Sequence, residues 1–269
     1  MTIPQPRPYI KVTDCGNTVL VKHCPFVPPE EPPVRRIDDA YYLVTSTAEV
    51  RRYAPRSRVK GDNLASVRKS FNRLKSLINA NCEHPSHIRY VTLTYAENMT
   101  DNSRISKHME RFFSRMHGLY GDFEYIYVKE RQARGAWHMH CVLFFPGEAP
   151  YMPSSDDDHP VRDAWGRGWV NVQGFRGSIN NLGNYLCAYL TDDREASKKG
   201  ARLANYESGI RLYNCSRGIR RPLERAVCYE DFVEFATRGD TLLLSEREGR
   251  FPASDLRSRT VISQIFAVV

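Results

Sequence analysis

Long hydrophobic runs are missing from this chain of 269 residues. The two longest, residues 141–145 and 265–269, are five residues each, whereas a membrane-spanning helix needs about 20 apolar residues. The first fourteen residues, MTIPQPRPYIKVTD, contain no apolar segment typical of a secretory signal peptide. We therefore predict a soluble, cytoplasmic protein without a membrane partner.

Two kinds of motif are also absent from the sequence. No glycine-rich phosphate loop ending in Gly-Lys-Ser or Gly-Lys-Thr occurs, which excludes a nucleotide-driven motor of that type and predicts no nucleotide cofactor. The seven cysteines are odd in number and scattered along the chain. Without an export signal, we interpret them as reduced thiols rather than as a disulfide framework.

Acidic residues are the scarcer charged type. Lys and Arg number 39 against 31 Asp and Glu, which gives a formal net charge of +8 and a pI near 9.1. Hydrophobic residues make up 41% of the chain, enough to build a core, so the excess positive charge belongs to a folded protein. This balance favours an anionic partner, with nucleic acid as the first candidate.

Helical and strand patterns follow one another through the middle of the chain. We predict three parts: a proline-rich N-terminal extension (1–60), a central domain (61–222) and a C-terminal extension (223–269). Apolar periodicity in the central domain predicts helices at 64–80, 103–118 and 182–190, strands at 89–95, 123–129, 136–145 and 168–172, and an exposed loop at 150–162. The order indicates an α+β fold, an antiparallel β-sheet with packed helices of the ferredoxin or RRM-like kind.

Basic residues gather in one stretch before the first predicted strand. From Arg51 to Ala80 there are nine basic residues and a single acid, Asp62. A solvated helix face accounts for any one of these charges, but nine of one sign favour contact with phosphates. A second basic segment with the same two readings contains Arg217, Arg220 and Arg221 beside Tyr213.

A predicted hairpin brings two histidines and a carboxylate together. His138 and His140 are two apart in a strand, so both imidazoles project from one face. A three-residue loop at 133–135, with Gly135 at positive φ, places Glu130 directly across from His138 on that face. This set can hold a divalent cation such as Mg²⁺ or Mn²⁺ and leave positions open for substrate oxygens. The alternative is a chance His-x-His pair beside a surface glutamate.

Three other groups carry weaker signals. Tyr185 and Tyr189 are four residues apart in the predicted helix 182–190 and share a face, either as packing aromatics or as nucleophilic phenols. The spacing of Cys82, His84 and His87 could ligate Zn²⁺ only with a distant fourth residue. Trp137 and Trp169 are predicted to pack in the sheet.

Several of these blocks together resemble the HUH endonucleases, and in particular the rolling-circle replication initiators of small phages, plasmids and integrative elements. The resemblance spans residues 64–221 and rests on the order and spacing of VTLTYAEN (91–98), ERQARGAWHMH (130–140), WGRGWVNV (165–172) and NLGNYLCAYL (181–190).

The resemblance implies a metal-dependent enzyme that nicks single-stranded DNA at a replication origin. His138 and His140 match the metal histidines, and Glu130 matches the third ligand of Mg²⁺ or Mn²⁺. Tyr185 and Tyr189 match the tyrosines that form a 5′-phosphotyrosine and free a 3′-hydroxyl. Expected DNA contacts are Thr92 and Thr94 of the first motif, the basic residues Arg68, Lys69 and Arg73, and Arg217, Arg220 and Arg221. A helicase and a polymerase of the host are expected partners.

One departure from the family pattern concerns the tyrosine motif. The family commonly has a lysine three residues after each tyrosine, where this chain has Ala188 and Asp192; Lys198 and Lys199 are candidate replacements. The NYL context favours Tyr185 slightly over Tyr189 as the nucleophile. Two other functions stay open: a relaxase or single-strand transposase with the same chemistry, and a non-catalytic RRM-like nucleic-acid binder.

Overall fold

The computed structural model describes residues 3–55, 58–60, 64–132, 134–155, 158–174, 206–251 and 259–268. The chain divides into two compact units. Unit 2 consists of Arg58–Pro222 together with Cys15–Asn17. Unit 1 consists of Met1–Asp14, Thr18–Ser57 and Leu223–Val269.

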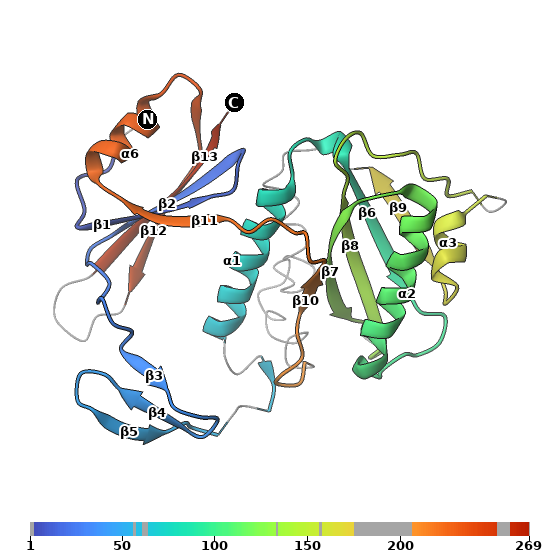
Figure 1. Cartoon of the computed structure of the whole chain (residues 1–269), viewed down its shortest axis with the longest axis horizontal. Coiled ribbons are helices and arrows are strands. Elements are labelled where there is room, and N and C mark those ends of the chain that lie inside the picture. The colour runs from blue at the N-terminus through green and yellow to red at the C-terminus, as the bar shows by residue number, and fades with distance from the viewer. Residues whose placement is uncertain are drawn as a thin grey trace. The chain divides into compact units, whose positions relative to one another are not determined.

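A five-stranded antiparallel sheet forms the centre of unit 2 (Figure 1). Its order is β10-β7-β8-β6-β9, so the two longest strands are neighbours in the middle of the sheet. Alternating apolar, β-branched and aromatic residues explain these strands. Their bounds are β6 Ile88–Thr94, β7 Glu124–Arg131, β8 Trp137–Phe144, β9 Val170–Gly174 and β10 Tyr213–Cys215.

One face of this sheet is covered by helix α2 (Asn102–Tyr120), and the short helix α3 (Pro160–Trp165) packs beside it. Asp101 caps α2 by accepting a hydrogen bond from the Ser103 amide at 2.8 Å. The covered face carries the odd-numbered residues of β6, because Tyr95 bonds His108 of α2 and stacks near Trp165 of α3. Register then places the even-numbered residues on the opposite face.

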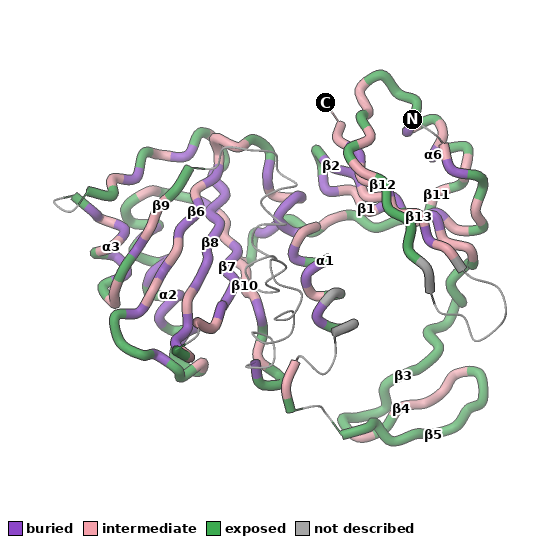
Figure 2. The backbone as a smooth tube through the Cα atoms, turned by 180° about the vertical axis from the view of Figure 1, so that it is seen from behind, coloured by how far each residue is buried: buried purple, intermediate pink, exposed green. Residues whose placement is uncertain are grey.

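Helix α1 (Leu64–Asn81) contributes to the same core. Its apolar stripe recurs at three- and four-residue spacing, as the sequence predicts, and its members are buried. Figure 2 shows the buried strands β6, β7 and β8 as continuous purple segments. The buried residues of the helix are Val67, Phe71, Leu74, Leu77 and Ile78.

Unit 1 joins the two ends of the chain in one sheet. Its order is β11-β1-β2-β13-β12, formed by β1 (Tyr9–Asp14), β2 (Thr18–Cys24), β11 (Leu223–Val227), β12 (Thr241–Phe251) and β13 (Arg259–Val268). Helix α6 (Tyr229–Thr237) supplies Phe232 and Ala236 to its core. A separate three-stranded sheet, β3 (Val34–Arg36), β4 (Tyr41–Val44) and β5 (Glu49–Arg52), has no buried residue.

The predicted α+β fold with antiparallel strands and packed helices is confirmed. The predicted strands and helices between residues 64 and 145 agree with the structure to within three residues. The predicted loop 150–162 is wrong at its end, because His159 caps a helix that begins at Pro160. The extensions 1–60 and 223–269 were predicted as separate parts, whereas strands from both pair in unit 1. The predicted helix 182–190 lies outside the described residues.

Gly168 allows the chain entering β9 to lie directly against β6. Its φ is +148°, and a Cβ there would lie 2.4 Å from the Thr94 carbonyl oxygen and 2.4 Å from the Ala96 nitrogen. Those backbone atoms cannot move without breaking the hydrogen bond from Ala96 N to Arg167 O (2.8 Å). We expect Gly168→Ala to lower the free energy of unfolding by about 1–3 kcal/mol, measured by urea denaturation.

Gly147→Ala provides the matched control, because a Cβ at Gly147 meets nothing within 4 Å. That variant should change the unfolding free energy by less than about 0.5 kcal/mol. Equal stability of the two variants would show that the approach of β9 to β6 does not need a glycine.

Candidate metal centre

The hairpin between β7 and β8 has the geometry that its sequence predicts. Gln132 N donates to Ala136 O at 2.9 Å and Gly135 N donates to Gln132 O at 2.8 Å, which closes a three-residue loop. Gly135 has φ +87°, the left-handed region that glycine enters without strain. Glu130 pairs with His138 in the ladder. The predicted loop and register are therefore confirmed.

Three side chains converge on the sheet face opposite α2. The ligand atoms of Glu130, His138 and His140 all lie within 4.8 Å of one another. Glu130 Oε2 lies 2.7 Å from His140 Nε2, and both side chains are more than nine-tenths buried. The carboxylate thus contacts the diagonal histidine rather than His138 directly opposite, which cross-strand pairing alone does not reveal.

Tyr90 of β6 holds the other nitrogen of His140. Its buried hydroxyl is hydrogen-bonded to His140 Nδ1, while Nε2 faces Glu130. A phenol can donate or accept, so Tyr90 can accept the Nδ1 proton when Nε2 gives its lone pair to a metal. Partners of this kind fix the tautomer and orientation of ligating histidines. Tyr90 is therefore a positioning residue for His140.

His138 is less buried and has weaker partners. Its Nε2 lies 3.3 Å from Thr94 Oγ1, and its Nδ1 lies 3.3 Å from Gln132 Nε2. Burial, followed by the nearby His140, lowers the pKa of His138 to about 4. The ring is neutral near pH 7 as a result, and one nitrogen keeps a lone pair for a cation.

The donor set fits a divalent cation. Two imidazole nitrogens and one carboxylate oxygen leave coordination positions for water or phosphate oxygens, an arrangement that suits Mn²⁺ and Mg²⁺ among other ions. Within the described ranges, no other group of three His, Cys, Asp or Glu residues brings its ligand atoms this close. Cys82, His84 and His87 do not form a comparable cluster, so the structure gives no support for zinc there.

The predicted DNA-contacting residues occupy several places in unit 2. Thr92 and Thr94 pair with His140 and His138 in the sheet, so both lie on the face of the metal centre. Lys69 and Arg73 are exposed on α1, and the charge of Arg73 acts on Tyr213 of β10. Arg217, Arg220 and Arg221 are exposed after β10; Arg220 forms a 2.8 Å ion pair with Glu83. The Arg68 side chain, Lys198, Lys199, Tyr185 and Tyr189 lie outside what the structure describes.

Two residues near the site did not stand out in the sequence. Tyr90 could have been found from alternation, since Tyr90, Thr92 and Thr94 share one face of β6. Trp169 was predicted to pack in the sheet, and this is wrong, because its residue is 58% exposed at the edge strand β9. Trp137 does pack as predicted and is 1% exposed.

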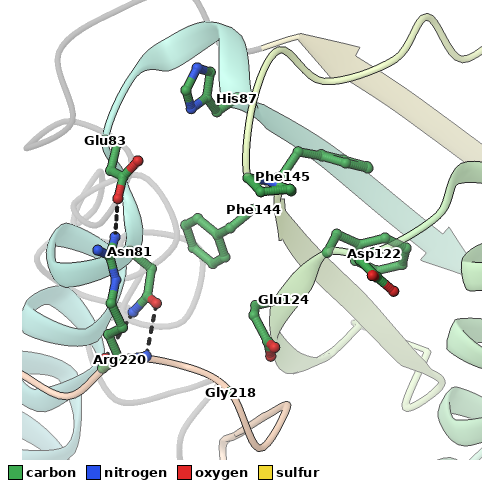
Figure 3. Close-up of a pocket in the computed structure, with 11 residues that line it drawn as sticks. Asn81, Glu83, His87, Asp122, Glu124, Phe144, Phe145, Gly218 and Arg220 are labelled. Atoms are coloured by element: carbon green, nitrogen blue, oxygen red, sulfur yellow. Dashed lines mark hydrogen bonds and ion pairs between the residues drawn. The ribbon is translucent and has the colours of Figure 1, made fainter.

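A cavity of about 280 Å³ lies at the other end of β8 (Figure 3). Its lining residue Phe144 is four residues from His140 along the strand, a separation of about 13 Å, so the cavity is distinct from the metal centre. Figure 3 shows the carboxylates of Glu83, Asp122 and Glu124 around the Phe144 ring. Three carboxylates at one opening do not favour a DNA phosphate.

Comparison with known families places this geometry in context. Residues 88–194 match the family of replication-associated proteins of the ORF2 type. This segment is a replication-associated domain of that family. The matched range contains the whole metal centre, Tyr90 and Trp169, and it extends over the positions of both candidate tyrosines. The resemblance to rolling-circle replication initiators is thereby confirmed.

No curated protein and no solved structure matches the chain significantly. The family nevertheless assigns a role in replication and implies binding of DNA at an origin. In the part of the chain that the structure describes, no helix is long and apolar enough to cross a membrane.

The hydrogen bond from Tyr90 yields a test of the metal centre. Without the hydroxyl, His140 loses the partner of Nδ1, so its orientation and tautomer are less well fixed. We expect Tyr90→Phe to raise the dissociation constant for Mn²⁺ by about 10- to 100-fold, measured from free Mn²⁺ by electron paramagnetic resonance.

Tyr127→Phe is the matched control. Tyr127 is also buried and its hydroxyl accepts a 2.9 Å bond from Asn214, but its side chain lies on the α2 face. Its removal should leave Mn²⁺ affinity unchanged. An equal loss in both variants would assign the effect to stability rather than to His140.

Proposed function

We propose that this protein is a metal-dependent tyrosine endonuclease that nicks single-stranded origin DNA to start rolling-circle replication. The observation that carries the proposal is the Glu130, His138 and His140 cluster on the open face of the sheet, inside the family-matched segment. The same segment includes Tyr185 and Tyr189, which supply the only nucleophile type the proposal needs.

The chemistry is a transesterification at phosphorus. A divalent cation bound by Glu130, His138 and His140 would polarise the scissile phosphate and balance charge that develops on its oxygens. The phenol oxygen of Tyr185 or Tyr189 attacks phosphorus, and the bond from phosphorus to the 3′ oxygen breaks. The phenol proton is lost as attack proceeds, and the leaving oxygen takes up a proton to become a 3′-hydroxyl. The product is a 5′-phosphotyrosine.

Rejoining follows from the same site in reverse. A 3′-hydroxyl attacks the phosphotyrosine and releases the phenol, so strand transfer needs no external energy source. This agrees with the absence of a nucleotide-binding loop from the sequence. Unwinding and synthesis then require a helicase and a polymerase of the host, with the freed 3′-hydroxyl as primer.

Exposed basic residues supply the grip on the DNA backbone. Lys69, Arg73, Arg217 and Arg221 are exposed in unit 2, and contacts of this kind hold phosphates without reading the sequence. Affinity for single strands should therefore fall steeply as salt rises. A relaxase or single-strand transposase would use the same chemistry on a different element.

The nucleophile is tested by a denaturing gel that detects covalent protein–DNA adducts. Single-stranded oligonucleotides tiled across the protein's own replicon are incubated with Mn²⁺ and either wild type, Tyr185→Phe, Tyr189→Phe or the double variant. We expect an adduct with wild type and none with the double variant, with the greater loss at Tyr185→Phe. Binding without an adduct on any tile would instead indicate a non-catalytic nucleic-acid binder.

The metal requirement is tested on the same oligonucleotides. EDTA should abolish the adduct, and Glu130→Gln should raise the Mn²⁺ concentration for half-maximal adduct by more than about tenfold, since a neutral amide is a poorer ligand. Glu124→Gln, on the same strand but at the cavity, serves as the control and should leave this concentration unchanged. Full activity in EDTA would contradict the proposed role of the cluster.

A further inference from the structure

Trp169 is the exposed tryptophan of the chain. The sequence has three tryptophans, and Trp137 and Trp165 are only 1% and 2% exposed, whereas Trp169 is 58% exposed. A large aromatic ring on the surface of a sheet is unusual unless it contacts a partner, because its burial would otherwise stabilise the fold.

Register places Trp169 in line with the metal centre. Glu130 pairs with His138, and His138 pairs with Thr94. Thr94 N in turn donates to Trp169 O at 2.9 Å. The next residue, Val170, is buried and pairs with Leu93, so it faces α2, and alternation directs Trp169 to the opposite face. Trp169 therefore shares the open face with the metal ligands.

The distance along this row suits a strand of DNA. Strands β8 and β9 are separated by β6 alone, which places Trp169 two strand spacings, or about 10 Å, from His138. This equals about three steps of 3.4 Å between stacked bases. A base over the indole would belong to a nucleotide close to the phosphate at the metal centre.

Gly168 holds the ring in this position. Only a residue without a Cβ fits here, because a Cβ would lie 2.4 Å from backbone atoms of both Thr94 and Ala96. The Trp169 backbone is consequently pressed against β6, and the edge strand cannot shift away from the metal centre without losing the Thr94–Trp169 hydrogen bond.

We propose that Trp169 is the stacking platform for one base of the single-stranded substrate, within about three nucleotides of the phosphate that is cleaved. The inference rests on the proposed function for its substrate. Stacking on an aromatic ring suits single strands, since unpaired bases expose their π-faces and every base has one. Trp169 would thus position the strand while the metal ligands act on its phosphate.

Fluorescence quenching tests this directly, because acrylamide reaches Trp169 and not the two buried tryptophans. The full chain is titrated in EDTA with an oligonucleotide of the tile that gives the adduct, and otherwise with oligothymidylate. We expect DNA to reduce acrylamide quenching to the level of Trp169→Phe, which has no exposed tryptophan.

Affinity for the same oligonucleotide provides the second measurement. Trp169→Ala should weaken binding by about 5- to 150-fold, the range found for base–aromatic stacking, and Trp169→Phe should retain part of the affinity. Tyr151→Ala is the matched control, since Tyr151 is an aromatic residue of unit 2 that is 84% exposed. That variant should bind like wild type, and circular dichroism should show all three variants folded.

The outcomes separate this inference from the proposed function. If wild type forms the adduct but Trp169 stays quenchable and Trp169→Ala binds normally, the stacking role is overturned and the nuclease stands. Equal losses in Trp169→Ala and Tyr151→Ala would also overturn it. If Trp169 is protected by DNA while no adduct forms on any tile, the stacking platform is supported and the nicking mechanism is not.

Discussion

The candidate site depends on the register of a single hairpin. The loop between β7 and β8 contains three residues and closes at Gly135, so Glu130 faces His138 and His140 stands one pleat further along the strand. A slip of one residue would turn the whole set to the α2 side, because side chains alternate strictly in a strand. The glycine at positive φ and the buried Trp137 next to the loop both oppose such a slip.

The two faces of this sheet have different tasks. On the α2 side, β7 buries Lys129, whose ammonium donates to Asn102 Oδ1 at 2.7 Å, and burial lowers the pKa of that lysine to about 8. On the other side, the neighbouring Glu130 meets His140. Packing therefore anchors the strand from one face while the other keeps its ionisable groups for chemistry. A rigid element supported in this way positions ligands more accurately than a loop could.

Local features of the site could be predicted from the sequence, and long-range ones could not. Loop length and alternation, which act over ten residues, were sufficient for Glu130, His138 and His140. The contact of Tyr90 with His140 joins residues 50 apart and depends on strand order, which no local pattern encodes. Trp169 was assigned to packing because aromatics are typical of strands; only its place on the edge strand shows that it is exposed. Tyr185 and Tyr189 remain predictions.

The sheet of unit 1 has a consequence for how the chain is made. His23 of β2 bonds Gln264 of β13 across 241 residues, so this sheet lacks two of its strands until the last part of the chain has been synthesised. The metal-bearing sheet needs residues only up to Cys215. Because domains fold as they emerge and long-range pairings form slowly, the metal-bearing sheet can be complete on the ribosome while the first strands still wait for their partners.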